Sequence, residues 1–342
     1  MAGPAYVTRD TILDVGGYGS VIADRIDRAI FTASRRIEDT LHRRFYPLSA
    51  TVTYHEPYEP SSFVGAEAFW LKDDLQSASS VTVDGTADTD YVLLPKDGPP
   101  YNRIVVGSFR QVDTIITGVW GYGYTTATAG ALDAEIATTT AATCDVTGAC
   151  SATVGVGDLI AIEDERLIVT GRTAIDTAAN LNGALTAQAN DQTVTLSDGT
   201  GFVAGEELLI ESERLKVLDV AGNDLTVERG YRGTTLAAHD TAKDVYGYRR
   251  LSVDRGATGT TAATHADTTA ITVYSPPPQI RDYALAEALN QLEQEGAGYA
   301  RVVGSADNQR EARGAGLADV ASQGGEENMA ADRRAALHET QT

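Results

Sequence analysis

The chain has 342 residues, with 48 acidic against 27 basic side chains and a formal net charge of -21 at pH 7. This length predicts about two domains, and 42% hydrophobic residues are enough for a packed core, which excludes a chain disordered throughout. The acidic excess argues against a protein that grips DNA or an anionic membrane, because both need a basic face.

Other patterns narrow the class further. The first eleven residues lack the cationic and apolar regions of a secretory signal, and no apolar run approaches the roughly 20 residues of a membrane-spanning helix. Cys144 and Cys150 are too few for a disulfide framework, so we expect two small thiols, with a bond in an oxidising compartment as the alternative. We expect a soluble chain made inside the cell. Its few lysines fit either a salt-adapted surface or a GC-rich genome, and thus a halophile or a GC-rich host.

The first predicted element is a long amphipathic helix over 21–46. One apolar stripe recurs at spacings of three and four residues, and it consists of Ile22, Ile26, Ile30, Ala33, Ile37 and Leu41. Six arginines lie off this stripe: Arg25, Arg28, Arg35, Arg36, Arg43 and Arg44. They form either a docking face for an acidic neighbour or a solvated face with intrahelical ion pairs.

Residues 47–123 change to a period of two. The alternation predicts short strands, which are 51–54, 69–71, 81–83, 91–94, 103–106 and 112–119. The segment closes on GVWGYG (118–123), whose glycines let Trp120 and Tyr122 pack against nearby backbone.

Residues 125–274 form a Thr-, Ala- and Gly-rich β region with two internal repeats. GDLIAIEDERLIV (157–169) aligns with GEELLIESERLKV (205–217), 48 residues later. LTVERGYRGTTLAAH (225–239) aligns with LSVDRGATGTTAATH (251–265), only 26 residues later. Two offsets exclude a simple tandem array and predict nested modules: an outer one over 140–170 with 251–274, and an inner one over 193–248. The repeated histidines, His239 and His265, then pack turns and are not catalytic.

The second strong helix follows Pro276-Pro277-Pro278 and is predicted over 279–295, with Gly296 at its end. Ile280, Leu285 and Leu289 lie on its apolar side and, with Trp120 and Tyr122, complete the expected core. Residues 275–303 thus carry the C-terminal helix of the core. Residues 304–342 read as a tail that is flexible or that orders only on a partner, with Leu317 and Val320 as docking candidates.

Catalytic signatures are missing from the sequence. It has no HExxH or CxxC metal pair, no phosphate-binding GxxxxGK[ST] loop and no GxSxG elbow. Asp84, Asp88 and Asp90 lack the glutamate that a calcium loop requires, so a polar hairpin turn explains them better. We therefore expect no enzymatic activity, no cofactor and no metal.

The flanks resemble the head–tail connector (adaptor) proteins of tailed double-stranded DNA viruses. The matching segments are 37–46, 118–123 and 277–292, about half of the chain with the residues between them, and the 125–274 repeats are similar to β modules inserted in many virion proteins. The resemblance implies an α+β fold, with a small helical core and short strands in residues 1–124 and 275–303 and an all-β insert. The insert is a departure, because typical adaptors lack it.

The resemblance also implies a place in the virion, assembled in the host cytoplasm. The chain would form a homo-oligomeric ring, usually of twelve copies, in the neck beneath the portal protein. It would contact a tail-side stopper or tail-completion protein and let DNA pass without specific binding, away from any membrane. The alternative is a virion decoration or carbohydrate-binding protein that acts through the β modules, although Trp70 and Trp120 both lie outside them.

Overall fold

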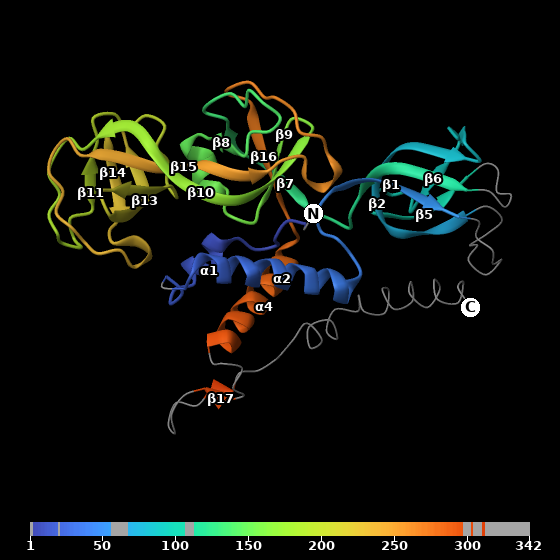
Figure 1. Ribbon diagram of the computed structural model, residues 1–342, viewed down its shortest axis with the longest axis horizontal. Helices are drawn as coiled ribbons and strands as arrows, with labels where there is room; N and C mark the ends of the chain where they lie inside the picture. Colours follow the sequence, from blue (N-terminus) through green and yellow to red (C-terminus); the bar gives the residue numbers. More distant parts are fainter. Residues whose placement is uncertain are drawn as a thin grey trace. The chain divides into compact units, whose positions relative to one another are not determined.

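Figure 1 shows a computed structural model of the protein, which describes residues 3–19, 21–55, 68–106, 113–296, 302–303 and 310–311. These residues form mostly antiparallel β-sheet with few helices. The chain divides into two compact units: the module unit (Met1–Phe31 with Thr126–Tyr274) and the flank unit (Thr32–Thr125 with Ser275–Thr342). A mixed α+β fold is compatible with this content, but the described residues do not show the small helical core expected for the flanks; the flank unit contains a six-stranded sheet.

The flank sheet is antiparallel, in the order β1-β6-β2-β5-β4, and β3 pairs with β2. Its strands are β1 (Leu48–Tyr54), β2 (Ala68–Val83), β3 (Thr86–Ala87), β4 (Val92–Leu94), β5 (Tyr101–Val105) and β6 (Thr114–Trp120). Alternate residues of β6 are buried, so one face of this strand contributes to the hydrophobic cluster that contains Leu75, Ile104, Ile116 and Trp120.

One correction concerns β2. The separate strands predicted at 69–71 and 81–83 are the two ends of this single 16-residue strand. Its pairing shifts register between Trp70 and Leu75, between Leu75 and Ser77, and again between Ala78 and Ser80. Each irregularity interrupts the alternation of inward and outward side chains, and for this reason the polar middle of the strand carries no period-two pattern.

The residues that the structure describes form two long helices, one before the flank sheet in the chain and one after the β modules. Helix α2 (Ala23–Leu41) buries the predicted stripe from Ile26 to Leu41, whereas Ile22 precedes the helix and is 68% exposed. The helix ends five residues before the predicted end because His42 takes a positive φ of 52°. Helix α4 (Pro278–Gly296) agrees with its prediction to within one residue at each end. Two further short strands, β17 (Val302–Val303) and β18 (Arg310–Glu311), pair with each other.

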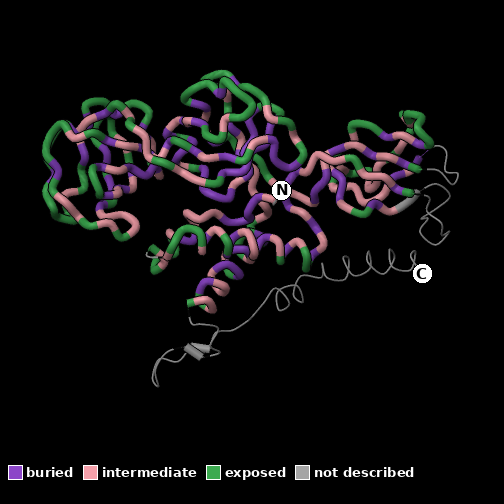
Figure 2. Tube along the Cα trace, viewed as in Figure 1, coloured by how far each residue is buried: buried purple, intermediate pink, exposed green. Residues whose placement is uncertain are grey.

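The module unit contains a ten-stranded sheet, the two short helices α1 and α3, and the part of α2 up to Phe31; Thr125 and Ser275 of the flank unit contribute the first residue of β7 and the last residue of β16. The elements are α1 (Arg9–Asp14), β7 (Thr125–Ala131), β8 (Thr143–Asp145), α3 (Gly148–Thr153), β9 (Leu159–Ile162), β10 (Glu165–Asn180), β11 (Thr193–Thr195), β12 (Glu207–Ile210), β13 (Glu213–Ala221), β14 (Asp224–Glu228), β15 (Asp244–Asp254) and β16 (Ala270–Ser275). The turns η2 (Tyr231–Gly233) and η3 (Ala257–Gly259) occupy equivalent places in the second repeat. Figure 2 colours the chain by burial; along β14 buried residues alternate with exposed ones, and along β15 mainly with half-buried ones, as in strands with one face on a core.

Two separate hydrophobic cores follow the nested order of the repeats. The outer core draws residues from 129–169 and again from 251–273, whereas the inner core lies wholly within 179–245. The modules were predicted to begin at residues 140 and 193, but both cores begin earlier in the sequence. Leu132, before the first predicted boundary, is in the outer core, and Ala179 and Leu181 are in the inner core.

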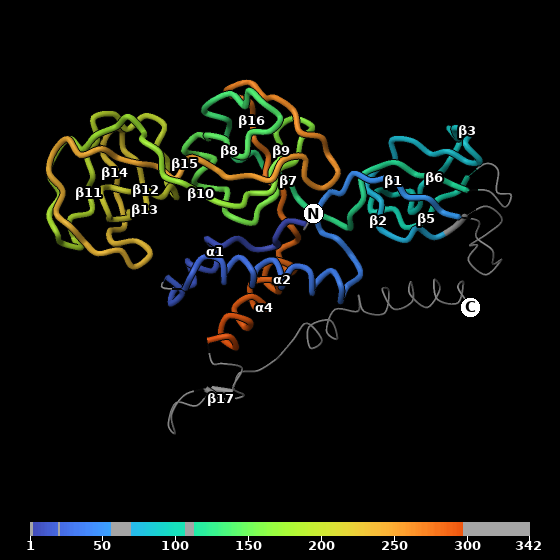
Figure 3. The backbone as a smooth tube through the Cα atoms, in the orientation of Figure 1, coloured from blue at the N-terminus to red at the C-terminus, as the bar shows by residue number. Residues whose placement is uncertain are grey.

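Strands β10 and β15 pass from one module into the other, and they can be followed in Figure 3. They pair with each other from Ile168 opposite Asp254 to Asn180 opposite Asp244, with three register shifts on the way. The inner module has no such interruption: β13 and β14 are joined directly by a turn at Gly222 and Asn223. The inner module is therefore continuous in sequence, whereas the equivalent part of the outer module is interrupted by the insertion of the inner one.

Candidate functional site

The structure distributes the six predicted docking arginines over several environments. Arg28 and Arg36 are exposed, Arg25, Arg35 and Arg44 are half-buried, and Arg43 is buried. Arg35 pairs with Glu38 at 2.8 Å and lies over the Tyr46 ring, whereas Arg36 pairs with Glu287 of α4. These arginines therefore form no uniform basic face, and Arg36 links α2 to α4.

Arg43 and Arg44 follow α2 and lie against the GVWGYG segment. The Arg43 guanidinium stacks over the Tyr122 ring at 4.0 Å and faces Asp74 at 3.5 Å, with both side chains almost fully buried. Arg44 pairs with Asp73 at 3.2 Å. Two neighbouring acidic residues of β2 thus hold two neighbouring arginines, and the cation–π contact adds to the buried pair.

Backbone hydrogen bonds also join the GVWGYG segment to Arg44 and to β2. The Tyr122 amide donates to the carbonyl of Arg44, and the Gly121 amide donates to the carbonyl of Asp74, both at 2.7 Å. Gly121 has a φ of +146°, and a Cβ there would lie 2.4 Å from the Tyr46 carbonyl oxygen. Glycine is required at this position because any side chain would collide with backbone.

The remaining predicted residues have mixed outcomes. Trp120 is 1% exposed and donates its Nε1–H to the Ala50 carbonyl at 3.0 Å, and Ile280 is buried. Leu285 and Leu289 are only half-buried, because α4 buries the face of Ala284 and Ala288 instead. Leu317 and Val320, with the predicted tail over 304–342, lie outside the described residues apart from the two residues of β18.

The repeated histidines each lie between two carboxylates. In the inner module, His239 contacts Glu211 through Nδ1 at 2.8 Å and Glu213 through Nε2 at 2.9 Å. In the outer module, His265 contacts Glu163 at 2.9 Å and Glu165 at 2.8 Å through the same two nitrogens. The two modules therefore place a carboxylate beside each ring nitrogen of the repeated histidine in the same way.

An arginine completes each of these clusters. Arg229 donates to both oxygens of Glu213 at 2.7 and 2.8 Å, and Arg255 does the same for Glu165 at 2.7 and 2.6 Å. Burial raises the pKa of Glu213, but its bonds from Arg229, backbone amides and His239 outweigh burial and lower the pKa to about 2. The same balance, with Arg255 and His265, brings the pKa of Glu165 to about 2.

The contacts of these clusters lie within the modules and hold turns of the fold together. Glu213 also accepts the amides of Gly230 and Ala237, at 2.9 and 3.1 Å, so its acceptor positions are filled. In the inner module, the Glu–Arg–His cluster holds the β12–β13 turn to the loop that ends at His239. In the outer module, the equivalent cluster holds the β9–β10 turn to the loop that ends at His265. Repetition of Glu, Arg and His at matching places was the signal in the sequence for this role, and Arg229 and Arg255 were not singled out from it.

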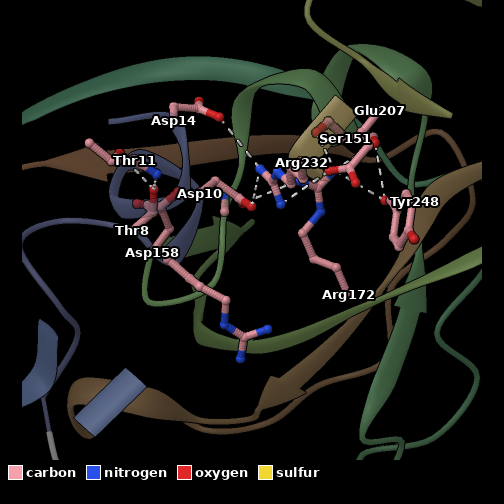
Figure 4. A network of polar contacts seen from close by, with 12 residues as sticks. Thr8, Asp10, Thr11, Asp14, Ser151, Asp158, Arg172, Glu207, Arg232 and Tyr248 are labelled. Carbon is pink, nitrogen blue, oxygen red and sulfur yellow. Dashed lines mark hydrogen bonds and ion pairs between the residues drawn. The ribbon is translucent and has the colours of Figure 1, made fainter. Parts of the chain in front are cut away.

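A further polar network, which the sequence did not predict, joins α1 to both modules (Figure 4). Thr8 caps α1 by accepting the Thr11 amide at 3.2 Å, and this places Asp10 between two arginines. Asp10 accepts from Arg172 of β10 at 3.2 Å and pairs with Arg232 of the inner module at 2.7 Å.

Both arginines have further partners. Arg172 donates to the carbonyl of Ser151 at 2.6 Å and to that of Tyr248 at 3.3 Å, and Arg232 pairs with Glu207 at 3.2 Å. Burial raises the pKa of Asp10, but attraction to the two arginines outweighs it and holds the pKa below its usual value. The same side chains line part of a cavity of about 350 Å³.

Within the described ranges, no group of three or more His, Cys, Asp or Glu side chains is arranged to hold a metal ion. Cys144 and Cys150 are free thiols, both buried, and burial raises the pKa of each to about 12. None of the described helices has both the length and the apolar character to cross a membrane.

Comparisons with protein-family models, with curated proteins and with solved structures find no match to this chain.

Proposed function

We propose that this protein is a head–tail connector of a tailed double-stranded DNA virus, a ring subunit between portal and tail that lines the DNA channel. The supporting observation is that the three segments resembling connectors meet in one unit. The segment after α2 bonds to GVWGYG through the Tyr122 amide and Arg44 carbonyl, and α2 is joined to α4 by Arg36 and Glu287.

The geometry of the insert supports the same function. The Thr125 hydroxyl donates to the Ser275 carbonyl at 3.5 Å, so the chain leaves the flank unit and returns to it at adjacent residues. Adjacent ends allow a domain to be inserted without distorting the unit that receives it. The flank unit, together with the N-terminal part of α2, then carries the connector role, and the β modules are an addition to it.

The charge fits a conduit for DNA. A subunit with a net charge of -21 repels the phosphate backbone, so DNA slides past it without the salt-dependent adhesion of a basic channel. In a closed ring, each subunit presents one face to a different face of its neighbour, and exposed Arg28 on α2 is a candidate for that contact. The expected partners are further copies of this chain, the portal protein and a tail-side stopper.

Electron microscopy and light scattering of the purified full chain, alone and mixed with the portal protein of the same virus, test this proposal. We expect rings with a central opening, of about twelve subunits. Arg28→Glu should weaken the ring, whereas Arg250→Glu, which reverses an exposed arginine paired with Asp145 in the modules, should leave it intact. Monomers that persist even with portal protein present would overturn the connector, and monomers that bind glycans would favour the decoration role.

A further inference from the structure

We propose that the cavity between α1 and the two β modules binds a small, multiply charged oxyanion of the phosphate or sulfate class, which ties the N-terminal segment to both modules. This inference is independent of the ring, because it rests on other residues than Arg28, the residue offered as the ring contact, and all of them belong to the module unit.

The first argument is the convergence of guanidinium groups from distant parts of the sequence. The cavity of about 350 Å³ is lined by Arg9 of α1, Arg172 of β10, Arg214 of β13 and Arg232 of η2. In Figure 4, Asp10, Arg172, Arg232 and Glu207 point toward one another. Guanidinium groups are the preferred donors for phosphate and sulfate because their planar N–H groups match two oxygens at once.

The second argument is that two buried donors lack acceptors. Among the residues that the structure describes, the Nε atoms of Arg172 and Arg232 have no hydrogen-bond partner. Their side chains are only 11% and 10% exposed. A buried N–H on a charged group is costly to leave unpaired, so these two guanidiniums keep donor capacity that the residues around them do not meet.

The third argument is the balance of charge around the cavity. The charge of Arg9 is neutralised by Asp27, to which Arg9 donates from Nε at 2.7 Å. Arg172, Arg214 and Arg232 then face the carboxylates of Asp10 and Glu207, while half-exposed Asp14 approaches Arg232 only to 3.8 Å. Three guanidiniums against two close carboxylates leave a positive excess.

The state of Asp10 supports this sign. Burial alone would raise the pKa of its carboxyl, yet the pKa lies below its usual value because Arg172 and Arg232 dominate. The local potential is therefore positive in a chain whose total charge is strongly negative. A volume of about 350 Å³ holds a small hydrated anion or a small organic phosphate, and it is too small to admit a DNA duplex.

Apolar side chains distinguish two sources of this anion. Leu13, Ile26 and Val156 also line the cavity, opposite in character to the arginines. A free inorganic ion would gain nothing from them, whereas the carbon part of a small organic phosphate would bury surface there. Comparing inorganic phosphate with glycerol phosphate separates the two sources.

The test is calorimetric titration and thermal unfolding of the full chain with inorganic phosphate, sulfate or glycerol phosphate, against chloride at equal ionic strength. We expect phosphate and sulfate to bind and to raise the melting temperature, and phosphate to slow amide exchange in residues 8–14. Arg214→Gln, which changes a side chain 35% exposed, should weaken phosphate binding about tenfold or more without unfolding the protein. Arg172→Lys keeps the charge but removes Nε, and should also weaken binding.

The control is Arg250→Gln, because this arginine makes a two-pronged pair with Asp145 on the module surface, away from the cavity. It should bind phosphate like the unaltered chain. Phosphate and sulfate that behave like chloride would overturn the proposal and leave water as the occupant. Equal weakening by Arg250→Gln, or displacement of phosphate by duplex DNA, would overturn it as well, because the binding would then follow surface charge.

Discussion

Glu213→Gln should destabilise the inner module while leaving the flank unit intact. Glu213 is fully buried, and each of its contacts is a donor: Arg229 twice, the amides of Gly230 and Ala237, and His239. Glutamine has nearly the same shape but replaces one acceptor oxygen with an NH₂ group. That group would face donors, and Arg229, only 1% exposed, would lose its counter-ion.

The magnitude follows from the burial of the pair. Removing one partner of a buried, hydrogen-bonded ion pair costs about 3–5 kcal/mol, because the other charge stays behind without compensation. Domains are stable by only about 5–15 kcal/mol, so this loss is a large share of the stability of the inner module. Glu165→Gln should cost the outer module a similar amount, because Glu165 makes the equivalent contacts with Arg255, Gly256, Ala263 and His265.

Two probes separate the units in a urea titration. Trp70 on β2 and Trp120 on β6 are the two tryptophans of the chain, so tryptophan fluorescence reports on the flank sheet. Amide exchange in residues 205–239 reports on the inner module. Glu213→Gln should move the exchange transition to lower urea and leave the fluorescence transition in place.

Glu211→Gln is the matched control. Glu211 contacts the same histidine, but its side chain is 44% exposed and water can replace its bonds, so we expect a far smaller effect. If the two substitutions shift the transition equally, the buried Arg–Glu–His cluster does not hold the module together. A shift in fluorescence as large as the shift in exchange would show that the units unfold as one.

Three further predictions concern other parts of the chain. Stability should fall as pH drops from about 4.5 to about 2, because Glu165 and Glu213 have folded pKa values of about 2 and must take up protons to unfold; acid titration of the exchange rates checks this, and modules unaffected above pH 2 would contradict it. Gly121→Ala should cost the flank unit about 2–3 kcal/mol by fluorescence-detected unfolding, whereas Gly123→Ala, with open space around the new Cβ, should change little. Cys144 and Cys150 should react with a disulfide reagent only on unfolding, because both thiols are buried with a pKa of about 12; rapid labelling of the native protein would refute this.

Sequence patterns located the elements whose ends carry local signals. The three prolines before Gln279 and the glycine at 296 place α4 to within a residue, because each fixes backbone geometry on the spot. The end of α2 was predicted too late, since Arg43 to Tyr46 continue a plausible helical pattern. Their partners, Asp73, Asp74 and Tyr122, come from later in the chain and hold them in a different conformation.

Long-range electrostatics could not be read from local patterns. Repetition identified the loops that contain His239 and His265. It did not show that Arg229 binds Glu213, or that Arg255 binds Glu165, within the same module. The cavity could not be predicted from the sequence at all, because it forms only where α1 packs against the modules. Asp10 of α1 meets Arg172 and Arg232, residues 162 and 222 positions away, and neither alignment nor periodicity relates them.

The hairpin turn at Gly222 and Asn223 has a consequence for how such proteins grow. In the outer module, the equivalent turn is replaced by the whole inner module, which enters through β10 and leaves through β15 as paired neighbours. A duplicated gene segment placed at this turn therefore enters and leaves through paired strands and brings a core of its own, separate from that of its host. The inner module offers the same turn again, so the chain keeps an unused point at which a third copy, or an engineered cargo, can be accommodated.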